Sequence, residues 1–429
     1  MLFMAHTILR RTAGALLLPI AVATAVASGI AGFFAAAAVT AWIPLLCGVG
    51  LVLLGGVAYL LARPAFALLG VRRRSRAATV LAAFLTVAVA GLAAATVFRP
   101  GPHPAAAPPP AGVQFWDLPT GSRIAYVHAP ASGTHRPTPV LFLHGGPGTP
   151  GEGVPAAGAL LAADGFEVYA YDQLGAGRST RLADVTGYTV ARQVADLDAI
   201  RAELGAERVV LIGQSWGGSL AAQYLSAYPQ HVARVVFTSP GPIWAGAYPD
   251  GGGGDPWARM TAEQRRQRDA LFGSPRLIAQ AILQGINSNA AHALVGDDEA
   301  DALMHAVAVL GKDSTRCPGS APAVVHDNHQ GFYVNQQTVE DFAHIPDPRP
   351  ALRQARVPAL VMRGECDFVP WEETYEYRRT LPQSTLVYLP HTGHDIASGQ
   401  PEAYAAVLRA FLRDEPLPLS PYTSAQPPS

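Results

Sequence analysis

Two glycine-rich segments contain the residue types of a serine nucleophile and of a loop that could support it. They are residues 144–148, His-Gly-Gly-Pro-Gly, and residues 213–218, Gly-Gln-Ser-Trp-Gly-Gly. Each follows a short apolar run that is typical of a buried strand. Ser215 is therefore expected on a sharp strand-to-helix turn, where its hydroxyl projects above the sheet and can attack a carbonyl carbon.

The negative charge that develops in such an attack needs hydrogen-bond donors. We expect these donors to be the backbone amide of Trp216 and that of Gly146, with Gly145 as the alternative in the same loop. The helix predicted to follow Ser215 points its amino terminus at the same place, which also favours negative charge.

A serine hydroxyl is a weak nucleophile unless a base takes its proton, and on a turn of this kind the acid and the histidine follow the serine in that order. Asp367 lies just beyond a later predicted strand, with Glu365 as its rival. The next predicted strand is followed by His394, with His391 as the alternative. We expect His394 to act as base and then acid, and Asp367 to orient its imidazole.

These segments, together with residues 172–179, Asp-Gln-Leu-Gly-Ala-Gly-Arg-Ser, resemble the proline iminopeptidase family of α/β-hydrolases. The resemblance spans about residues 113–415. It implies an α/β-hydrolase fold, which is a mostly parallel sheet with helices on both faces and an inserted helical cap. It also implies a serine aminopeptidase that releases amino-terminal proline, with the serine, acid and histidine named above as its triad.

The resemblance extends weakly into the cap. The family binds the free amino group of its substrate with cap carboxylates, and residues 326–333, His-Asp-Asn-His-Gln-Gly-Phe-Tyr, are similar to one such segment. Asp327 would take the place of the family's glutamate. We therefore expect Asp327 and Gly145 to bind the substrate; the alternative is that Asp327 is an ordinary loop acid. Candidates for a second carboxylate are Asp297, Asp298 and Glu299. The chain departs from the family in reading Gly-Gln-Ser at the turn, where Gly-Gly-Ser is common.

The amino-terminal part has a different composition. Three apolar stretches, at about residues 14–38, 41–61 and 77–98, contain no Asp, Glu, Lys or Arg. Each is long enough to cross a bilayer as a helix, which takes about 20 residues. The first stretch by itself could be a signal sequence, but three of them predict a permanent anchor of three transmembrane helices.

Arginines predict the orientation of this anchor. Arg10 and Arg11 precede the first stretch, and five arginines lie between residues 63 and 76, so both clusters are expected on the cytoplasmic side. The protein is then a multi-pass protein of the cell membrane with its catalytic domain on the extracytoplasmic side. The part after residue 100 has 23 basic and 32 acidic residues, a formal charge of −9, which argues against a nucleic-acid partner.

The domain organisation follows from these patterns. Cys317 and Cys366 would both be exported, so a disulfide between them is allowed, although spacing cannot show it. We see no cysteine and histidine cluster with metal-ligand spacing and no nucleotide loop, so we expect no metal and no cofactor. The oligomeric state is not indicated. The expected parts are a membrane anchor at 1–99, a proline-rich linker at 100–112, a hydrolase core at 113–240 and 351–415, a helical cap at 241–350 and a loose tail at 416–429.

Three classes of function remain open. The first is a membrane-anchored aminopeptidase that releases amino-terminal proline or a small residue from peptides. The second is an esterase or amidase with another small acyl substrate, because one triad serves many leaving groups. The third is a non-catalytic binding domain tethered to the lipid bilayer, which would not need to keep a serine, an acid, a histidine and an oxyanion loop together.

Overall fold

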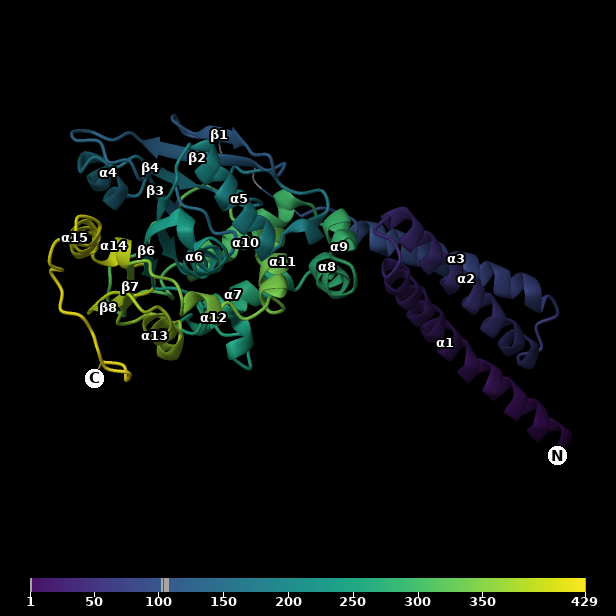
Figure 1. Ribbon diagram of the computed structural model, residues 1–429. Helices are drawn as coiled ribbons and strands as arrows, with labels where there is room; N and C mark the ends of the chain where they lie inside the picture. Colours follow the sequence, from purple (N-terminus) through teal and green to yellow (C-terminus); the bar gives the residue numbers. More distant parts are fainter. Residues whose placement is uncertain (1, 102, 104–107, 429) are drawn as a thin grey trace. The chain divides into compact units, whose positions relative to one another are not determined.

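The computed structural model describes residues 2–101, 103 and 108–428 (Figure 1). Part of the predicted linker at 100–112 and the last residue of the predicted tail therefore lie outside the described residues. The chain divides into two compact units, which we describe separately. The first contains Met1–Pro102 and Asp269–Glu299, and the second contains His103–Arg268 and Ala300–Ser429. The domain boundaries expected from the sequence stay predictions.

The second unit is built on one eight-stranded sheet, in the order β1-β2-β4-β3-β5-β6-β7-β8. The pairs β1–β2 and β2–β4 are antiparallel, and every other neighbouring pair is parallel. The predicted mostly parallel sheet is thus confirmed. The strands are β1 (Gln114–Asp117), β2 (Arg123–Ala129), β3 (Val140–Leu143), β4 (Val168–Tyr171), β5 (Val209–Gln214), β6 (Val232–Thr238), β7 (Ala359–Gly364) and β8 (Ser384–Leu389).

Helices cover both faces of this sheet, which explains why the central strands are continuous apolar runs rather than alternating ones. Alternate residues of the strands, such as Val140, Ile212 and Met362, pack in one core cluster with residues of the helices α4 and α15. Helices α5, α6 and α13 lie on the opposite face (Figure 1). The helices of this unit outside the insertion between β6 and β7 are α4 (Ala156–Ala163), α5 (Val190–Glu203), α6 (Trp216–Ala227), α13 (Trp371–Thr380), α14 (Ile396–Gly399) and α15 (Pro401–Leu412).

A long helical insertion separates β6 from β7, as the predicted cap requires. Short 3₁₀ helices occur at Val185–Gly187, Pro229–His231 and Ala245–Ala247. The insertion and the segment that returns to β7 contain α7 (Ala262–Phe272), α8 (Pro275–Ile286), α9 (Ser288–Leu294), α10 (Asp297–Gly311), α11 (Phe332–Phe342) and α12 (Arg349–Leu352). Residues Asp269–Glu299 of this insertion belong to the first compact unit.

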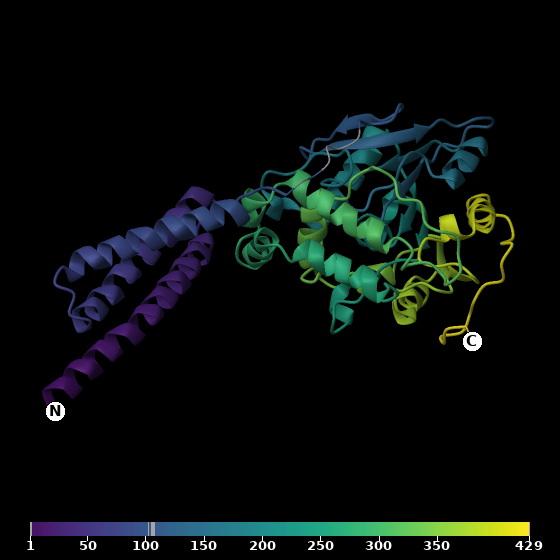
Figure 2. The same ribbon diagram turned by 180° about the vertical axis from the view of Figure 1, so that it is seen from behind.

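The first unit contains α1 (Leu2–Ala37), α2 (Ile43–Leu68) and α3 (Arg74–Thr96), which lie side by side (Figures 1 and 2). All three helices are long and apolar enough to cross a membrane. Their exposed side chains are largely aliphatic, as expected of helices whose outer surface faces lipid rather than water.

The parallel strands bring the predicted site residues to one edge of the sheet. The last residue of β3, Leu143, pairs with Gly213 of β5, so the loops that follow these two strands begin side by side. The segments after β7 and β8 leave the sheet at the same edge, because carboxyl ends of parallel strands point the same way. This edge therefore carries the segments that contain Ser215, the loop at 144–148, Asp367 and His394.

Candidate active site

Ser215 occupies the turn between β5 and α6, and its backbone has φ 54° and ψ −120°. Few residues other than glycine adopt such a conformation, which costs of the order of 1–3 kcal/mol and persists only where the surroundings hold it. Two glycines make the turn possible. A Cβ added at Gly213 would lie 2.2 Å from the carbonyl oxygen of Gly217, and one added at Gly217 would lie 2.1 Å from that of Leu143.

The predicted oxyanion loop passes directly beside this turn. A Cβ at Gly145 would lie only 3.0 Å from the Cβ of Ser215 and 2.7 Å from Oε1 of Gln214. Gly146 has φ 114°, a value that favours glycine. Trp216 is the first residue of α6, so its backbone amide has no acceptor in a preceding helical turn. The residues predicted to bind an oxyanion are therefore close to the predicted nucleophile.

His144 and Gln173 hold this loop in place, a role that the sequence analysis missed. The Nδ1 atom of His144 is 2.9 Å from the carbonyl oxygen of Gly145, and its Nε2 accepts a hydrogen bond from the backbone amide of Gln173 at 2.9 Å. Burial lowers the pKa of His144 to about 4. The imidazole is then neutral near pH 7, with the proton on Nδ1, which is the tautomer that both contacts require.

The Gln173 side chain joins the loop to the turn. Its amide nitrogen donates to the carbonyl oxygen of His144 at 2.8 Å, and its amide oxygen accepts from the indole nitrogen of Trp216 at 3.0 Å. Gln193 also accepts from this indole, at 3.3 Å. Gln173 lies within the segment that carries the family resemblance, and that was the only indication of its importance in the sequence.

The structure pairs the predicted acid with the predicted base. The Nδ1 atom of His394 is 2.6 Å from Oδ1 of Asp367, and both side chains are buried. The backbone amide of Val369 also donates to Oδ1, at 3.1 Å, and Nη1 of Arg363 is 3.4 Å from Oδ2. Burial raises the pKa of Asp367, but His394, Arg363 and the Val369 amide together outweigh it and hold that pKa below its ordinary value.

Glu365 and His391, the alternatives to Asp367 and His394, form a separate pair. The backbone amide of His391 donates to Oε2 of Glu365 at 2.6 Å, and the two side chains approach each other at 3.5 Å. The side chain of His391 is 88% exposed. Among the described residues, Ser215 forms no side-chain hydrogen bond with His394, so only two members of the predicted triad are joined directly. Contacts of this kind often tighten only when substrate is present.

A disulfide supports the acid and the base from the insertion. Cys317 and Cys366 are bonded, with their Cα atoms 5.1 Å apart. Cys366 directly precedes Asp367 in the chain, and the carbonyl oxygen of Thr315 accepts from the backbone amide of His394 at 3.0 Å. The segment around residues 315–317 therefore contacts both loops that carry the predicted acid and base.

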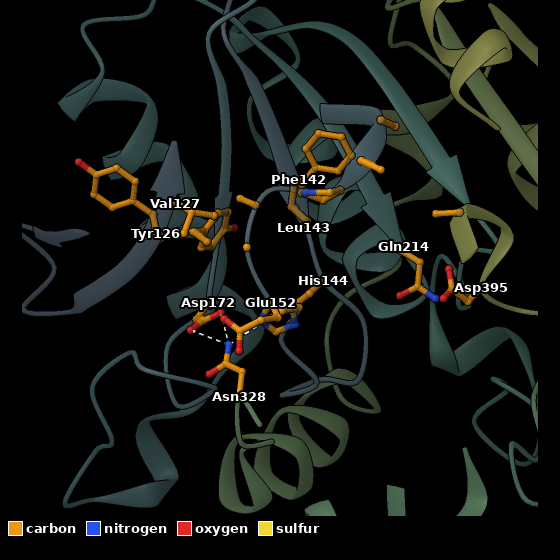
Figure 3. A pocket seen from close by; sticks show the side chains of 18 of the residues that line it. Tyr126, Val127, Phe142, Leu143, His144, Glu152, Asp172, Gln214, Asn328 and Asp395 are labelled. Carbon is orange, nitrogen blue, oxygen red and sulfur yellow. Dashed lines mark hydrogen bonds between the residues drawn. The ribbon is translucent and has the colours of Figure 1, made fainter. Parts of the chain in front are cut away.

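A cavity of about 220 Å³ lies beside this arrangement. It is lined by Gln214 and Asp395, the chain neighbours of Ser215 and His394, but the three predicted catalytic residues do not line it. Figure 3 shows Gln214 and Asp395 together on one side of the cavity, away from a polar group of four labelled side chains. These four are His144, Glu152, Asp172 and Asn328.

The carboxylates in this polar group already have partners. Glu152 binds Arg178 through two hydrogen bonds of 2.9 and 3.0 Å. Both oxygens of Asp172 accept from Nδ2 of Asn328 at 3.1 Å, and one also accepts from the Arg178 backbone amide at 2.9 Å. Burial raises the pKa of Asp172 to about 6 against these opposing contacts.

Asp327, the predicted amine-binding residue, does not line the cavity. Its side chain is exposed, whereas the next residue, Asn328, is buried and contacts Asp172. The other candidates, at 297–299, lie in the first turn of α10, where Glu299 is bound to Arg276. Among the described residues, no group of three His, Cys, Asp or Glu side chains could hold a metal ion.

Comparison with known proteins agrees with the fold. Residues 138–398 match the family described as alpha/beta hydrolase fold. A proline iminopeptidase of Heyndrickxia coagulans is 28% identical over 306 residues, which are 68% of this chain and 96% of that protein. A proline iminopeptidase of Levilactobacillus brevis is 30% identical over 284 residues, 64% of this chain and 88% of that protein.

Solved structures to which this chain is similar include a proline iminopeptidase and an esterase. A proline iminopeptidase of Mycobacterium smegmatis is 23% identical with a TM-score of 0.46, covering 70% of this chain and 98% of that one. The esterase EaEST of Exiguobacterium antarcticum is 20% identical with a TM-score of 0.46, over 70% of this chain and 98% of that one. On the sequence match over residues 138–398 and the similarity to these relatives, the chain is a serine hydrolase enzyme that belongs to the α/β-hydrolase family, among the relatives of the proline iminopeptidases.

Proposed function

We propose that this protein is a membrane-anchored aminopeptidase that releases an amino-terminal proline, or a small residue, from peptides through an acyl-enzyme formed on Ser215. The observation that carries the proposal is the buried pair of His394 and Asp367 at the sheet edge where Ser215 occupies a strained turn. The names of the curated relatives support the choice of substrate.

In the first half of the reaction, Ser215 Oγ attacks the carbonyl carbon of the amino-terminal residue, and Nε2 of His394 takes the hydroxyl proton. Nδ1–H of His394 stays bonded to Asp367, whose negative charge stabilises the imidazolium. The backbone amides of Trp216 and Gly146 bind the oxyanion; one such donor is typically worth about 2.7–4 kcal/mol of barrier. His394 then protonates the leaving nitrogen, the C–N bond breaks, and the shortened peptide departs.

In the second half, water attacks the acyl carbon while His394 takes its proton. The ester bond to Ser215 breaks, Ser215 recovers its proton from His394, and the free amino acid leaves. The atoms balance without a cofactor, since one water is consumed for each peptide bond that is cleaved.

An esterase or amidase on another acyl substrate is the second candidate. A specific observation favours it: Asp327 is exposed, and Glu152 and Asp172, which line the neighbouring cavity, are already bound to Arg178 and Asn328. The third carboxylate of that cavity, Asp395, accepts a hydrogen bond from the Ser398 backbone amide. Recognition of a free amino group requires a carboxylate that such a substrate can reach, because a buried ammonium is costly without a partner.

We also propose that α1–α3 cross the cell membrane and that the catalytic domain lies on its extracytoplasmic side. The arginines at 10, 11 and 63–76 support this orientation. The disulfide between Cys317 and Cys366 fits it too, because such bonds persist in oxidising compartments and are rare in the cytoplasm.

The test is hydrolysis of Pro-naphthylamide, Ala-naphthylamide, an amino-blocked Pro-naphthylamide and a short-chain ester by the detergent-solubilised protein. Cleavage of free but not blocked Pro-naphthylamide would support the aminopeptidase. Cleavage of the ester alone would place the protein in the second class. The Ser215→Ala variant, compared at equal folded concentration, should lose each activity; unchanged turnover in that variant would refute the role of Ser215.

A further inference from the structure

Helix α8 has an exposed face on which every residue is non-polar. Ile278, Ile282 and Ile286 are 50%, 44% and 42% exposed and recur every four residues, so they form one stripe along the helix. This exposure is similar to that of Leu45 and Leu53 on α2, at 44% and 41%. The other exposed residues of α8 are Pro275, Ala281 and Gly285.

The only charged residue of α8 is turned away from this face and is fully engaged. Arg276 is 7% exposed, and its guanidinium binds Glu299 through Nε and Nη2. The remaining donors reach the carbonyl oxygens of Leu294, at 2.6 Å, and of Val97, at 2.9 Å. A water-exposed helix normally carries charge on its outer face, whereas α8 keeps its charge inside and apolar side chains outside.

Contacts from this segment reach the ends of two of the apolar helices within the same compact unit. Val97 follows the last residue of α3, so Arg276 caps the carboxyl end of α3. Nδ2 of Asn287, just after α8, donates to the carbonyl oxygen of Ala37, the last residue of α1, at 2.9 Å. In addition, α8 packs on α1, and α9 packs on α2.

These contacts place α8 at one defined end of the bundle. The carboxyl ends of α1 and α3 lie opposite the loop between α2 and α3, which contains Arg72 and Arg73. Trp42 and Val39, in the connection between α1 and α2, belong to the same end and are 64% and 83% exposed. Tryptophan is enriched where membrane helices leave the hydrocarbon layer.

We infer that α8 lies in the headgroup region of the bilayer that α1–α3 cross, with Ile278, Ile282 and Ile286 inserted among the lipid chains. This inference rests on the membrane anchoring proposed above. Lipid is the occupant favoured by the structure, because the stripe belongs to the same compact unit as the apolar outer surface of the bundle and sits where that bundle would leave the membrane. Leu271 and Phe272, just before α8, are also exposed apolar residues of this unit.

The consequence is a second attachment of the enzyme to the membrane. The insertion between β6 and β7 is then attached to the membrane directly and not only through the linker at 100–112. The attachment consists of α8 and of the caps at Ala37 and Val97, which hold part of the insertion at the lipid surface.

The experiment measures lipid contact in the full chain. Single cysteines are introduced into a Cys47→Ala background, the Cys317–Cys366 bond is left oxidised, and each site is labelled with bimane. The variants are Ile282→Cys on α8, Val52→Cys on the exposed surface of α2, and Val339→Cys as a matched aliphatic control in the other unit, 52% exposed. Each protein is reconstituted into vesicles of phosphatidylcholine and phosphatidylglycerol, with or without phosphatidylcholine that carries a nitroxide, and iodide is used as the aqueous quencher.

We expect the nitroxide lipid to quench the Ile282 label at least twofold more than the Val339 label, with iodide showing the opposite order. If Val52 is quenched by nitroxide lipid but Ile282 is as open to iodide as Val339, the inference about α8 is wrong and the anchoring stands. If nitroxide lipid does not quench the Val52 label, the proposed membrane anchoring is wrong, and the inference about α8 is wrong with it. Protection of Ile282 from both quenchers, with self-quenching that grows with the protein-to-lipid ratio, would show a second copy on this face and also overturn the inference.

Discussion

The amide oxygen of Gln173 accepts a hydrogen bond from the indole nitrogen of Trp216 at 3.0 Å, while its amide nitrogen donates to the backbone of His144 at 2.8 Å. One buried side chain thus fixes the distance between the two segments whose amides are proposed to bind the oxyanion. Gln173 therefore helps to position that pair of donors, together with the contacts that His144 makes within the loop and with the Gln173 backbone.

Replacing Gln173 should therefore affect the chemical step more than substrate binding. In Gln173→Ala the carbonyl oxygen of His144 loses the side-chain donor of Gln173, and the Trp216 indole keeps only its longer hydrogen bond to Gln193. A buried group left unpaired costs about 1–3 kcal/mol. We expect kcat to fall roughly 10- to 100-fold with a smaller change in KM. Steady-state kinetics with the best substrate checks this, with Gln336→Ala, at an exposed glutamine, as the control. An equal loss of kcat in both variants would contradict the role of Gln173 in positioning the oxyanion donors.

The two acid–histidine pairs differ in burial, so we expect similar substitutions of their acids to change kcat by very different amounts. Asp367→Asn should reduce kcat by roughly 10⁴-fold, because the amide cannot stabilise the imidazolium or hold the required tautomer. Glu365→Gln should change kcat less than about twofold, since its partner His391 is exposed and the pair is solvated. The kcat values of both variants, measured at one pH, show which carboxylate acts as the acid of the triad. A large loss in Glu365→Gln alone would transfer the acid role to Glu365.

Glu373 should make stability fall as pH rises towards neutrality. This side chain is fully buried and accepts hydrogen bonds from the Gly253 amide, and burial raises its pKa to about 7. Because the folded state keeps this proton longer than the unfolded chain does, stability is lost between about pH 4.5 and 7 and the cost is constant above that range.

Glu373→Gln copies the protonated form at every pH. The variant should match the wild type near pH 4.5 and be more stable at pH 8, by about 3 kcal/mol at most. Melting temperatures in detergent at several pH values measure this difference, and Glu372→Gln, at the exposed neighbour, is the control. A difference between wild type and Glu373→Gln that does not vary with pH would contradict the assignment.

Breaking the disulfide should reduce both stability and activity. Cys317 and Cys366 are 49 residues apart, and closing a loop of that size is worth about 4 kcal/mol in the chain-entropy account. The double variant Cys317→Ser/Cys366→Ser should melt at a lower temperature and lose kcat, because the bond adjoins Asp367. Cys47→Ser is the matched control, and wild type treated with a reducing agent should behave like the double variant.

The proposed topology can be tested without any substrate. A reporter that is active only in the cytoplasm, fused after residue 112, should give no signal. The same reporter fused after Arg73, between α2 and α3, should be active, because Arg63, Arg72 and Arg73 place that loop inside. Activity at residue 112 and none at Arg73 would reverse the orientation.

The sequence by itself determined the features that depend on neighbouring residues. Apolar runs bounded by glycine predicted the strands that precede Ser215 and the loop at 144–148, and the structure places them as β5 and β3. Three uncharged stretches predicted three helices able to cross a membrane, and these are present. Such features are local, because strand formation, a glycine turn and hydrophobic length are decided within a few to about twenty residues.

The tertiary structure alone decided which side chains meet. Asp367 and Glu365 follow the same strand two residues apart, and only burial against Arg363 and His394 separates their environments. The contacts of Gln173 and the bond between Cys317 and Cys366 likewise join segments far apart in the chain. So do the caps that Arg276 and Asn287 provide to α3 and α1. Hydrogen bonds and burial depend on which surfaces the fold brings together, and no periodicity within one segment records that choice.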